Sequence, residues 1–141
     1  MITEPIRRGR TSDPGRSAFG QRSELRRLLA LGLVQVYAWS HGQHAARDAL
    51  PALIARIHAA FVQYLSGDGE LAARLLEEVP RDGPLRAQAL RAAHARQRRA
   101  LEALCTRPEQ ARTDAFADEF DGLARTLLTD IANEERDLGH A

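Results

Sequence analysis

The sequence predicts an all-α fold, an antiparallel up-down-up-down four-helix bundle. Apolar residues make up 44% of the 141 residues but aromatic residues only 5%, a composition that favours closely packed helices over a β-sandwich. Four segments carry apolar residues at spacings of three and four, the pattern of amphipathic helices. The connections between these segments are short, which favours antiparallel neighbours in a bundle. A chain of this length forms one domain with a single core.

The first helix is expected to begin at Ser23, whose hydroxyl can cap it, and to end near Gly42. Residues 1–22 are rich in Arg, Gly, Pro and Ser with little periodicity. We therefore expect a flexible basic arm over residues 1–22 and the bundle over residues 23–141. Trp39 and Tyr37 are both expected in the core. The apolar stripe of this first helix consists of Leu25, Leu28, Leu29, Gly32, Val36 and Trp39.

The second helix is expected to start at Asp48, because Pro51 is tolerated in a first turn. Residues 66–69 (Ser-Gly-Asp-Gly) interrupt its apolar stripe, and the sequence leaves open whether they kink or break the helix. A loop rich in proline and glycine follows at residues 80–84. The stripe before the interruption consists of Leu50, Leu53, Ile54, Ile57, Phe61, Tyr64 and Leu65.

The third helix is predicted to run to about Leu104, and the fourth from a cap at Thr113 or Asp114 to about Leu138. The third places Leu90, His94, Gln97, Leu101 and Leu104 on one side. The fourth has an apolar stripe of Phe116, Phe120, Leu123, Leu127, Ile131 and Leu138, and Asp130 and Glu134 fall on that same stripe. A buried carboxylate costs several kcal/mol unless it is partnered. We therefore expect a polar layer in the bundle centre, in which the available partners are His94, Gln97, Arg98 and Tyr64.

The pattern of the fourth helix, F-x-x-x-F-x-x-L-x-x-x-L-x-x-D-I-x-x-E-E, resembles the last helix of bacterial hemerythrin-like (HHE cation-binding) four-helix bundles. The resemblance implies a di-iron centre held by histidines and carboxylates from all four helices. This chain departs from that set, because the family normally has a histidine at the position of Asp130. The family's second-helix histidine falls on Asp68 or Gly69 and its glutamate on Ala72 or Ala73. The second histidine of the third helix falls on Arg98.

The metal-ligand candidates that remain are His94, Asp130 and Glu134, with Asp68 and Gln35 as further positions. Two interpretations of His94 stay open: a core histidine hydrogen-bonded to Asp130 or Glu134, or a ligand in a residual metal site. No catalytic residues are predicted, because the sequence has no serine elbow, phosphate loop or paired cysteine and histidine. The single cysteine, Cys105, is expected to be a small buried side chain.

Residues 64–69 (Tyr-Leu-Ser-Gly-Asp-Gly) also give a weaker resemblance, to the regulator-of-sigma-D family of anti-sigma proteins. That resemblance implies that such a bundle can serve as a protein-binding module. We therefore predict a non-enzymatic regulatory or protein-interaction module with a degenerate metal site and no cofactor. The alternative is a diverged metal- or oxygen-binding protein that holds iron through His94, Asp130 and Glu134.

The net charge and the cysteine content limit which kinds of partner and which cellular compartment are expected. The net charge of +1 argues against nucleic acid as a partner, and no apolar run is long enough for a membrane span. A protein partner is expected, and the chain itself is a monomer or a homodimer. One cysteine and the lack of an apolar leader before Asp13 predict a cytoplasmic protein.

Overall fold

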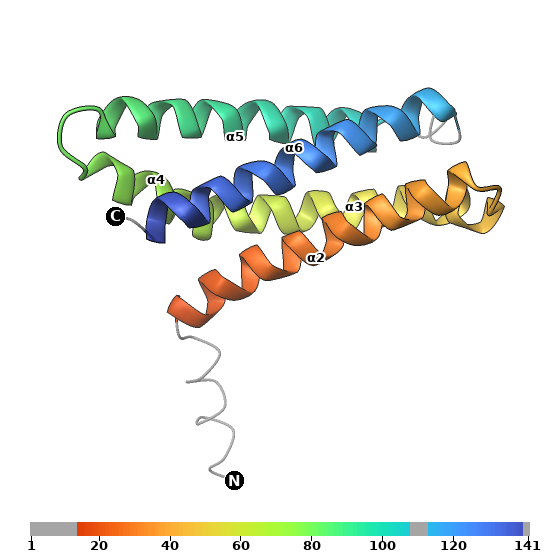
Figure 1. Cartoon of the computed structure of the whole chain (residues 1–141), viewed down its shortest axis with the longest axis horizontal. Coiled ribbons are helices and arrows are strands. Elements are labelled where there is room, and N and C mark those ends of the chain that lie inside the picture. The colour runs from red at the N-terminus through yellow and green to blue at the C-terminus, as the bar shows by residue number, and fades with distance from the viewer. Residues whose placement is uncertain (1–13, 108–112, 140–141) are drawn as a thin grey trace, which may run out of the picture.

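The structure, a computed structural model, describes residues 14–107 and 113–139, with side chains from residue 20 onward in the first range and up to residue 138 in the second. Its helices are α2 (Pro14–Ser40), α3 (His44–Ser66), α4 (Asp68–Glu77), α5 (Gly83–Cys105) and α6 (Asp114–Gly139). No strand occurs within the two described ranges, which confirms the all-α class. The junction of α2 with α3 lies at the same end of the molecule as the start of α6, and the junction of α4 with α5 lies at the other end (Figure 1).

The first helix begins earlier than predicted. We expected a flexible arm through residue 22 and a helix start at Ser23, but α2 already begins at Pro14, where a proline suits a first turn. The expectation of an arm is therefore wrong for residues 14–22, and residues 1–13 lie outside the described residues. The predicted end is confirmed: α2 stops at Ser40, and Gly42 has a φ of 87°, a left-handed conformation that glycine adopts without strain.

The second predicted helix is two helices. The predicted start at Asp48 is wrong, since α3 begins at His44 and Pro51 lies inside it, exposed, rather than in its first turn. The interruption proves to be a break at Gly67, whose φ and ψ of −115° and −92° end α3 and let α4 start at the next residue. A Cβ at Gly67 would meet the terminal amide of Gln21, so a larger residue here would have to displace that side chain.

The last two helices match the prediction closely. The helix α5 begins at Gly83, within the predicted loop at residues 80–84, because a proline at position 84 is tolerated in a first turn, and it ends at Cys105. The helix α6 begins at Asp114, and the Thr113 hydroxyl accepts a hydrogen bond from the backbone N–H of Phe116 at 3.1 Å, which is the expected cap. No helix in the described part of the chain is long and apolar enough to cross a membrane.

The core has two apolar parts with a polar layer between them. The larger part is built from the predicted stripes of α2, α3, α5 and α6, and the smaller one from Ala73, Leu76 and Ala87 with Leu90 against them. Along α5, His94 and Gln97 separate Leu101 of the larger part from Ala87 of the smaller one. Trp39 is buried as expected, but the expectation is wrong for Tyr37, which is 66% exposed, and for Cys105, which is exposed.

Candidate functional site

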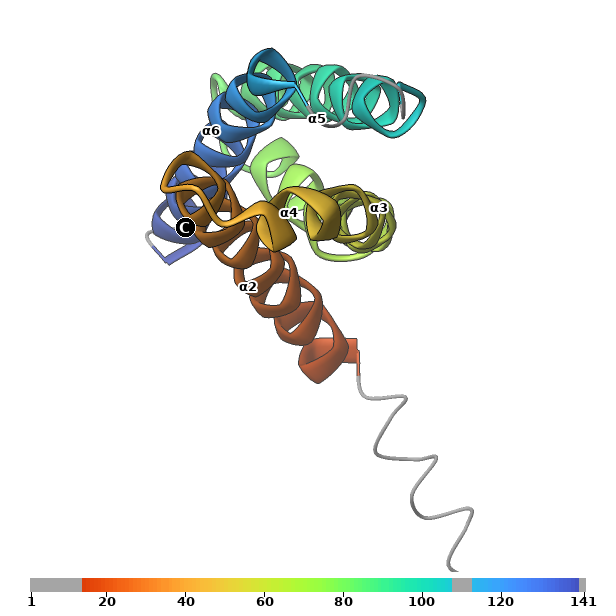
Figure 2. The same cartoon turned by 90° about the vertical axis from the view of Figure 1, so that its right-hand side faces the viewer.

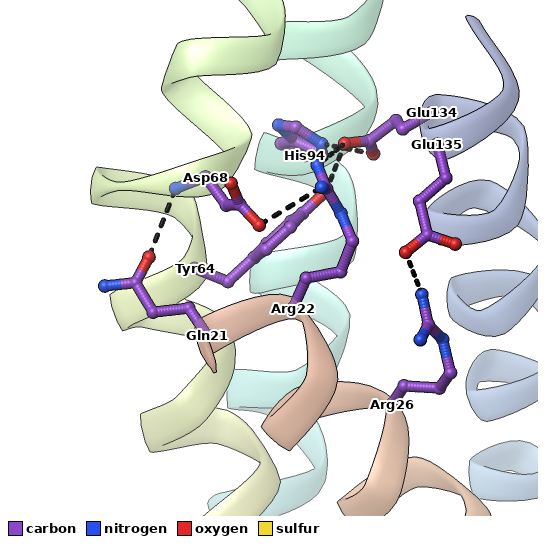
Figure 3. Close-up of polar contacts among 8 residues, drawn as sticks. All are labelled: Gln21, Arg22, Arg26, Tyr64, Asp68, His94, Glu134 and Glu135. Carbon is purple, nitrogen blue, oxygen red and sulfur yellow. Dashed lines mark hydrogen bonds and ion pairs between the residues drawn. The ribbon is translucent and has the colours of Figure 1, made fainter. Parts of the chain in front are cut away.

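The polar layer gathers side chains from all five helices of the described chain. Figure 3 shows most of it: the side chains converge from α2, α3, α4, α5 and α6 toward the carboxylate of Glu134. Each of its buried members is less than a tenth exposed, although most of them are charged or polar. These members are Arg22, Tyr64, Asp68, His94, Gln97 and Glu134.

Arg22 brings a positive charge into the centre of this layer from α2. Its Nη1 lies 3.3 Å from Oδ2 of Asp68, and its Nη2 lies 3.8 Å from Oε1 of Glu134. The guanidinium carbon is 6.0 Å from the centre of the Tyr64 ring. Nε and Nη2 of Arg22 have no hydrogen-bond partner among the described residues, so the guanidinium acts here mainly as a buried charge between two carboxylates.

Glu134 contacts three other members of the layer, Arg22, Tyr64 and His94. The Tyr64 hydroxyl donates a hydrogen bond to its Oε1, and Nε2 of His94 lies 3.2 Å from its Oε2. Burial, followed by the negative charge of Glu134, raises the pKa of Tyr64, so the phenol stays protonated and remains a donor. The sequence left Asp130 and Glu134 open as partners of His94, and in the structure the partner is Glu134.

Asp130 lies half-buried beside the layer rather than at its centre. It accepts a hydrogen bond from Nε2 of Gln97 and has no cationic partner within the described ranges. The polar layer predicted from the stripes of α5 and α6 is therefore present, and it consists of two neighbouring pairs, His94 with Glu134 and Gln97 with Asp130. Arg98, the other partner considered, is exposed and pairs instead with Glu102 at 3.1 Å on its own helix.

Asp68 occupies the first turn of α4, where the break at Gly67 turns its carboxylate toward α2. Its backbone N–H donates to Oε1 of Gln21 at 3.2 Å, so two neighbouring residues of α2 hold this turn. Burial raises the pKa of Asp68; Arg22 opposes the shift and Glu134 adds to it.

The three metal-ligand candidates do not meet at one point. His94 and Glu134 are in contact, whereas Asp130 is turned to Gln97. Among the described residues, no group of three or more His, Cys, Asp or Glu side chains is placed to hold a metal ion. Gln35, the remaining candidate on α2, lies 13 residues beyond Arg22 on the same helix, a rise of roughly 20 Å, and is outside the layer.

Arg22 and Gln21 are the site residues that the sequence reasoning missed. Both fall in the segment assigned to the arm, so neither was considered for the core. A signal was available, because Arg22 precedes Leu25 and Leu29 by three and seven residues and so continues their stripe.

Comparisons of the chain with protein-family models, with curated proteins and with solved structures found no match.

Proposed function

We propose that the chain is a non-enzymatic, antiparallel up-down-up-down four-helix bundle of hemerythrin-like type that acts as a regulatory or protein-interaction module, its metal site being degenerate. The observation that carries this proposal is the position of Arg22. Its guanidinium lies between the carboxylates of Asp68 and Glu134, where it supplies the positive charge that a metal cation would otherwise bring. Arginine has no lone pair to offer a metal and does not lose its proton in proteins, so it excludes a second cation by repulsion.

The remaining groups of the layer support a structural role rather than catalysis. The Tyr64 hydroxyl and Nε2 of His94 are both directed at Glu134, which favours a role in holding the helices together over attack on a substrate. The one thiol is also poorly suited to nucleophilic chemistry. Desolvation, and then the negative charge of Glu102, raises the pKa of Cys105 and disfavours its thiolate.

The surface of α2 supports a role in protein interaction. Leu31, Val34 and Tyr37 follow one another at spacings of three and are 38%, 60% and 66% exposed. No Asp, Glu, Lys or Arg occurs from residue 28 to residue 46, so this face has no charge of its own. Contiguous exposed apolar side chains are typical of surfaces that bind other proteins.

Two measurements test the proposal. Protein purified from iron-supplemented cells should contain far less than one metal ion per chain, and chemical cross-linking in the source cells followed by mass spectrometry should recover a specific partner protein. Stoichiometric iron that is lost in both His94→Leu and Asp130→Asn variants would refute the proposal in favour of the metal- or oxygen-binding alternative. Absence of any partner beyond background would refute the interaction role.

A further inference from the structure

The helices α5 and α6 diverge toward the end of the molecule where α4 lies. In Figure 1 the two helices separate along the length of α6 toward the end where α4 lies, and Figure 2 shows α4 below α5 and to one side of α6. A groove of about 320 Å³ opens in this region. Its lining residues from α4 and α5 are Leu76, Arg86, Ala89, Leu90 and Ala93, and those from α6 are Asp130, Asn133, Glu134 and Asp137.

The groove has an apolar side and an acidic side. Leu76 and Leu90 form its apolar base together with the small side chains of α5, while α6 contributes the carboxylates. Two interactions between α5 and α6 bracket it: Arg86 donates to Asp137 at 3.3 Å at one end, and Gln97 donates to Asp130 at the other. Between these two links the groove is open along one face of α5.

The charge around the groove is not balanced by the layer beneath it. Three carboxylates line the groove, those of Asp130, Glu134 and Asp137. Among the described residues, Asp137 pairs with Arg86 and Glu134 with Arg22, whereas Asp130 pairs with no cation. Within residues 14–107 and 113–139, the partner of Asp130 is the neutral amide of Gln97, and Asp130 is half-buried, where charge interactions are screened less than on an open surface. A cation placed in the groove beside Asp130 would offset this excess.

We propose that this groove binds a protein segment that presents a lysine or arginine next to an apolar side chain. The cation would lie against Asp130 and the apolar side chain against Leu76 and Leu90. The size of the groove suits one or two side chains of a docked helix rather than a whole helix. This inference rests on the interaction role proposed above and names the chemistry of the partner.

The test uses the full chain labelled with ¹⁵N and a pair of alanine-based helical peptides. One peptide carries a leucine and an arginine four residues apart, and the other carries citrulline, a neutral isostere, in place of the arginine. We expect the arginine peptide to shift the amide resonances of Ala89, Ala93 and Asn133 in a saturable way. The citrulline peptide should bind about three- to fivefold more weakly, the factor that a partly exposed charge pair contributes.

Variants of the protein test whether the peptides bind in the groove and whether the arginine lies against Asp130. Asp130→Asn should weaken the arginine peptide by about the same three- to fivefold factor and leave the citrulline peptide unchanged. Asp121→Asn is the matched control, because Asp121 lies on the same helix, is paired with Arg125 at 2.9 Å and does not line the groove. Ala89→Trp, at an exposed position on the groove wall, should block both peptides.

Equal affinity of the two peptides, resonance shifts confined to α2, or no saturable shift with either peptide would each overturn the groove proposal. None of these results affects the metal content or the recovery of a partner from cells, so a failure of this inference is distinguishable from a failure of the proposed function.

Discussion

Removing Arg22 is the sharpest perturbation of the polar layer. Arg22→Met keeps a long apolar stem and deletes the charge that lies 3.3 Å from Asp68 and 3.8 Å from Glu134, with all three side chains less than a tenth exposed. Breaking a buried ion pair by removing one partner costs about 3–5 kcal/mol. A carboxylate left without its partner can instead take up a proton. At pH 7 this costs about 1.4 kcal/mol for each of the roughly three pH units above the usual pKa of an aspartate, so the loss of stability from each carboxylate is at most about 4 kcal/mol. We expect a loss of about 3–4 kcal/mol, since Glu134 keeps two other donors.

The assay is urea unfolding followed by far-ultraviolet circular dichroism, with Arg26→Met as the matched control. Arg26 lies one turn further along α2 and pairs with Glu135, but both of these side chains are 42% exposed, so its removal should cost less than about 1 kcal/mol. Adding Asp68→Asn to Arg22→Met should recover much of the loss, because the uncompensated charge is then gone. Equal losses in the Arg22 and Arg26 variants, or a double variant in which the losses of Arg22→Met and Asp68→Asn simply add, would refute the reasoning.

The loss should also depend on pH. The pKa of Asp68 is raised by burial and is held down in part by Arg22, so the variant has a still higher folded-state pKa. A raised folded-state pKa gives stability that is present below the unfolded value, near 4, and is lost as the pH rises through the folded-state value. The gap between wild type and Arg22→Met should therefore be smallest near pH 4 and widen toward neutral pH. A gap that is constant over this range would show that Asp68 stays ionised without its partner.

Two further predictions concern packing and the His94 pair. Gly32→Ala should destabilise the fold, because a Cβ would lie 2.5 Å from the buried ring of Phe120, and the cost of overpacking, about 1–3 kcal/mol, outweighs the gain in helix propensity of about 1 kcal/mol. Gly122→Ala is the control and should stabilise the fold by that gain, because no atom lies within 4 Å of the added Cβ. Equal changes in the thermal unfolding midpoint of the two variants would contradict this prediction. A double-mutant cycle of His94→Leu and Glu134→Gln should give a coupling free energy of about 1 kcal/mol or more in urea unfolding, and additivity of the two losses would show that the 3.2 Å contact contributes nothing.

The last two helices could be predicted well from the sequence because their patterns are strong. In α6 the apolar stripe of Phe116, Phe120, Leu127 and Ile131 is buried as expected, and Thr113 forms the expected cap. The two acids on the stripe were expected near a polar layer, and that follows from the cost of burying an unpartnered carboxylate. The sequence could not choose Glu134 over Asp130 as the histidine's partner, because a small rotation of α6 decides between them.

The first half of the chain was harder to predict because its signals conflict. Residues 14–22 contain glycine, proline and arginine, which taken alone indicate a flexible arm, yet the segment is helical and carries Arg22 into the core. Tertiary contacts with Asp68 and Glu134 outweigh the weak local propensity, and such contacts are not visible in a local window. The start of α3 was misplaced for a similar reason, since Pro51 is accepted inside the helix at an exposed position.

The break at Gly67 and the helical start of α2 depend on one another. Because α3 ends at Gly67, Asp68 opens a new helix and directs its carboxylate at Arg22, which α2 can supply only if it is already helical at that residue. Apolar side chains in these positions would pack without the desolvation cost of an ion pair and would often be as stable or more so. They would, however, accept several alignments of α2 and α4 against α6, whereas Arg22, Asp68 and Glu134 meet in one alignment only. We therefore infer that the layer does more to fix the register of the helices than to raise the free energy of unfolding.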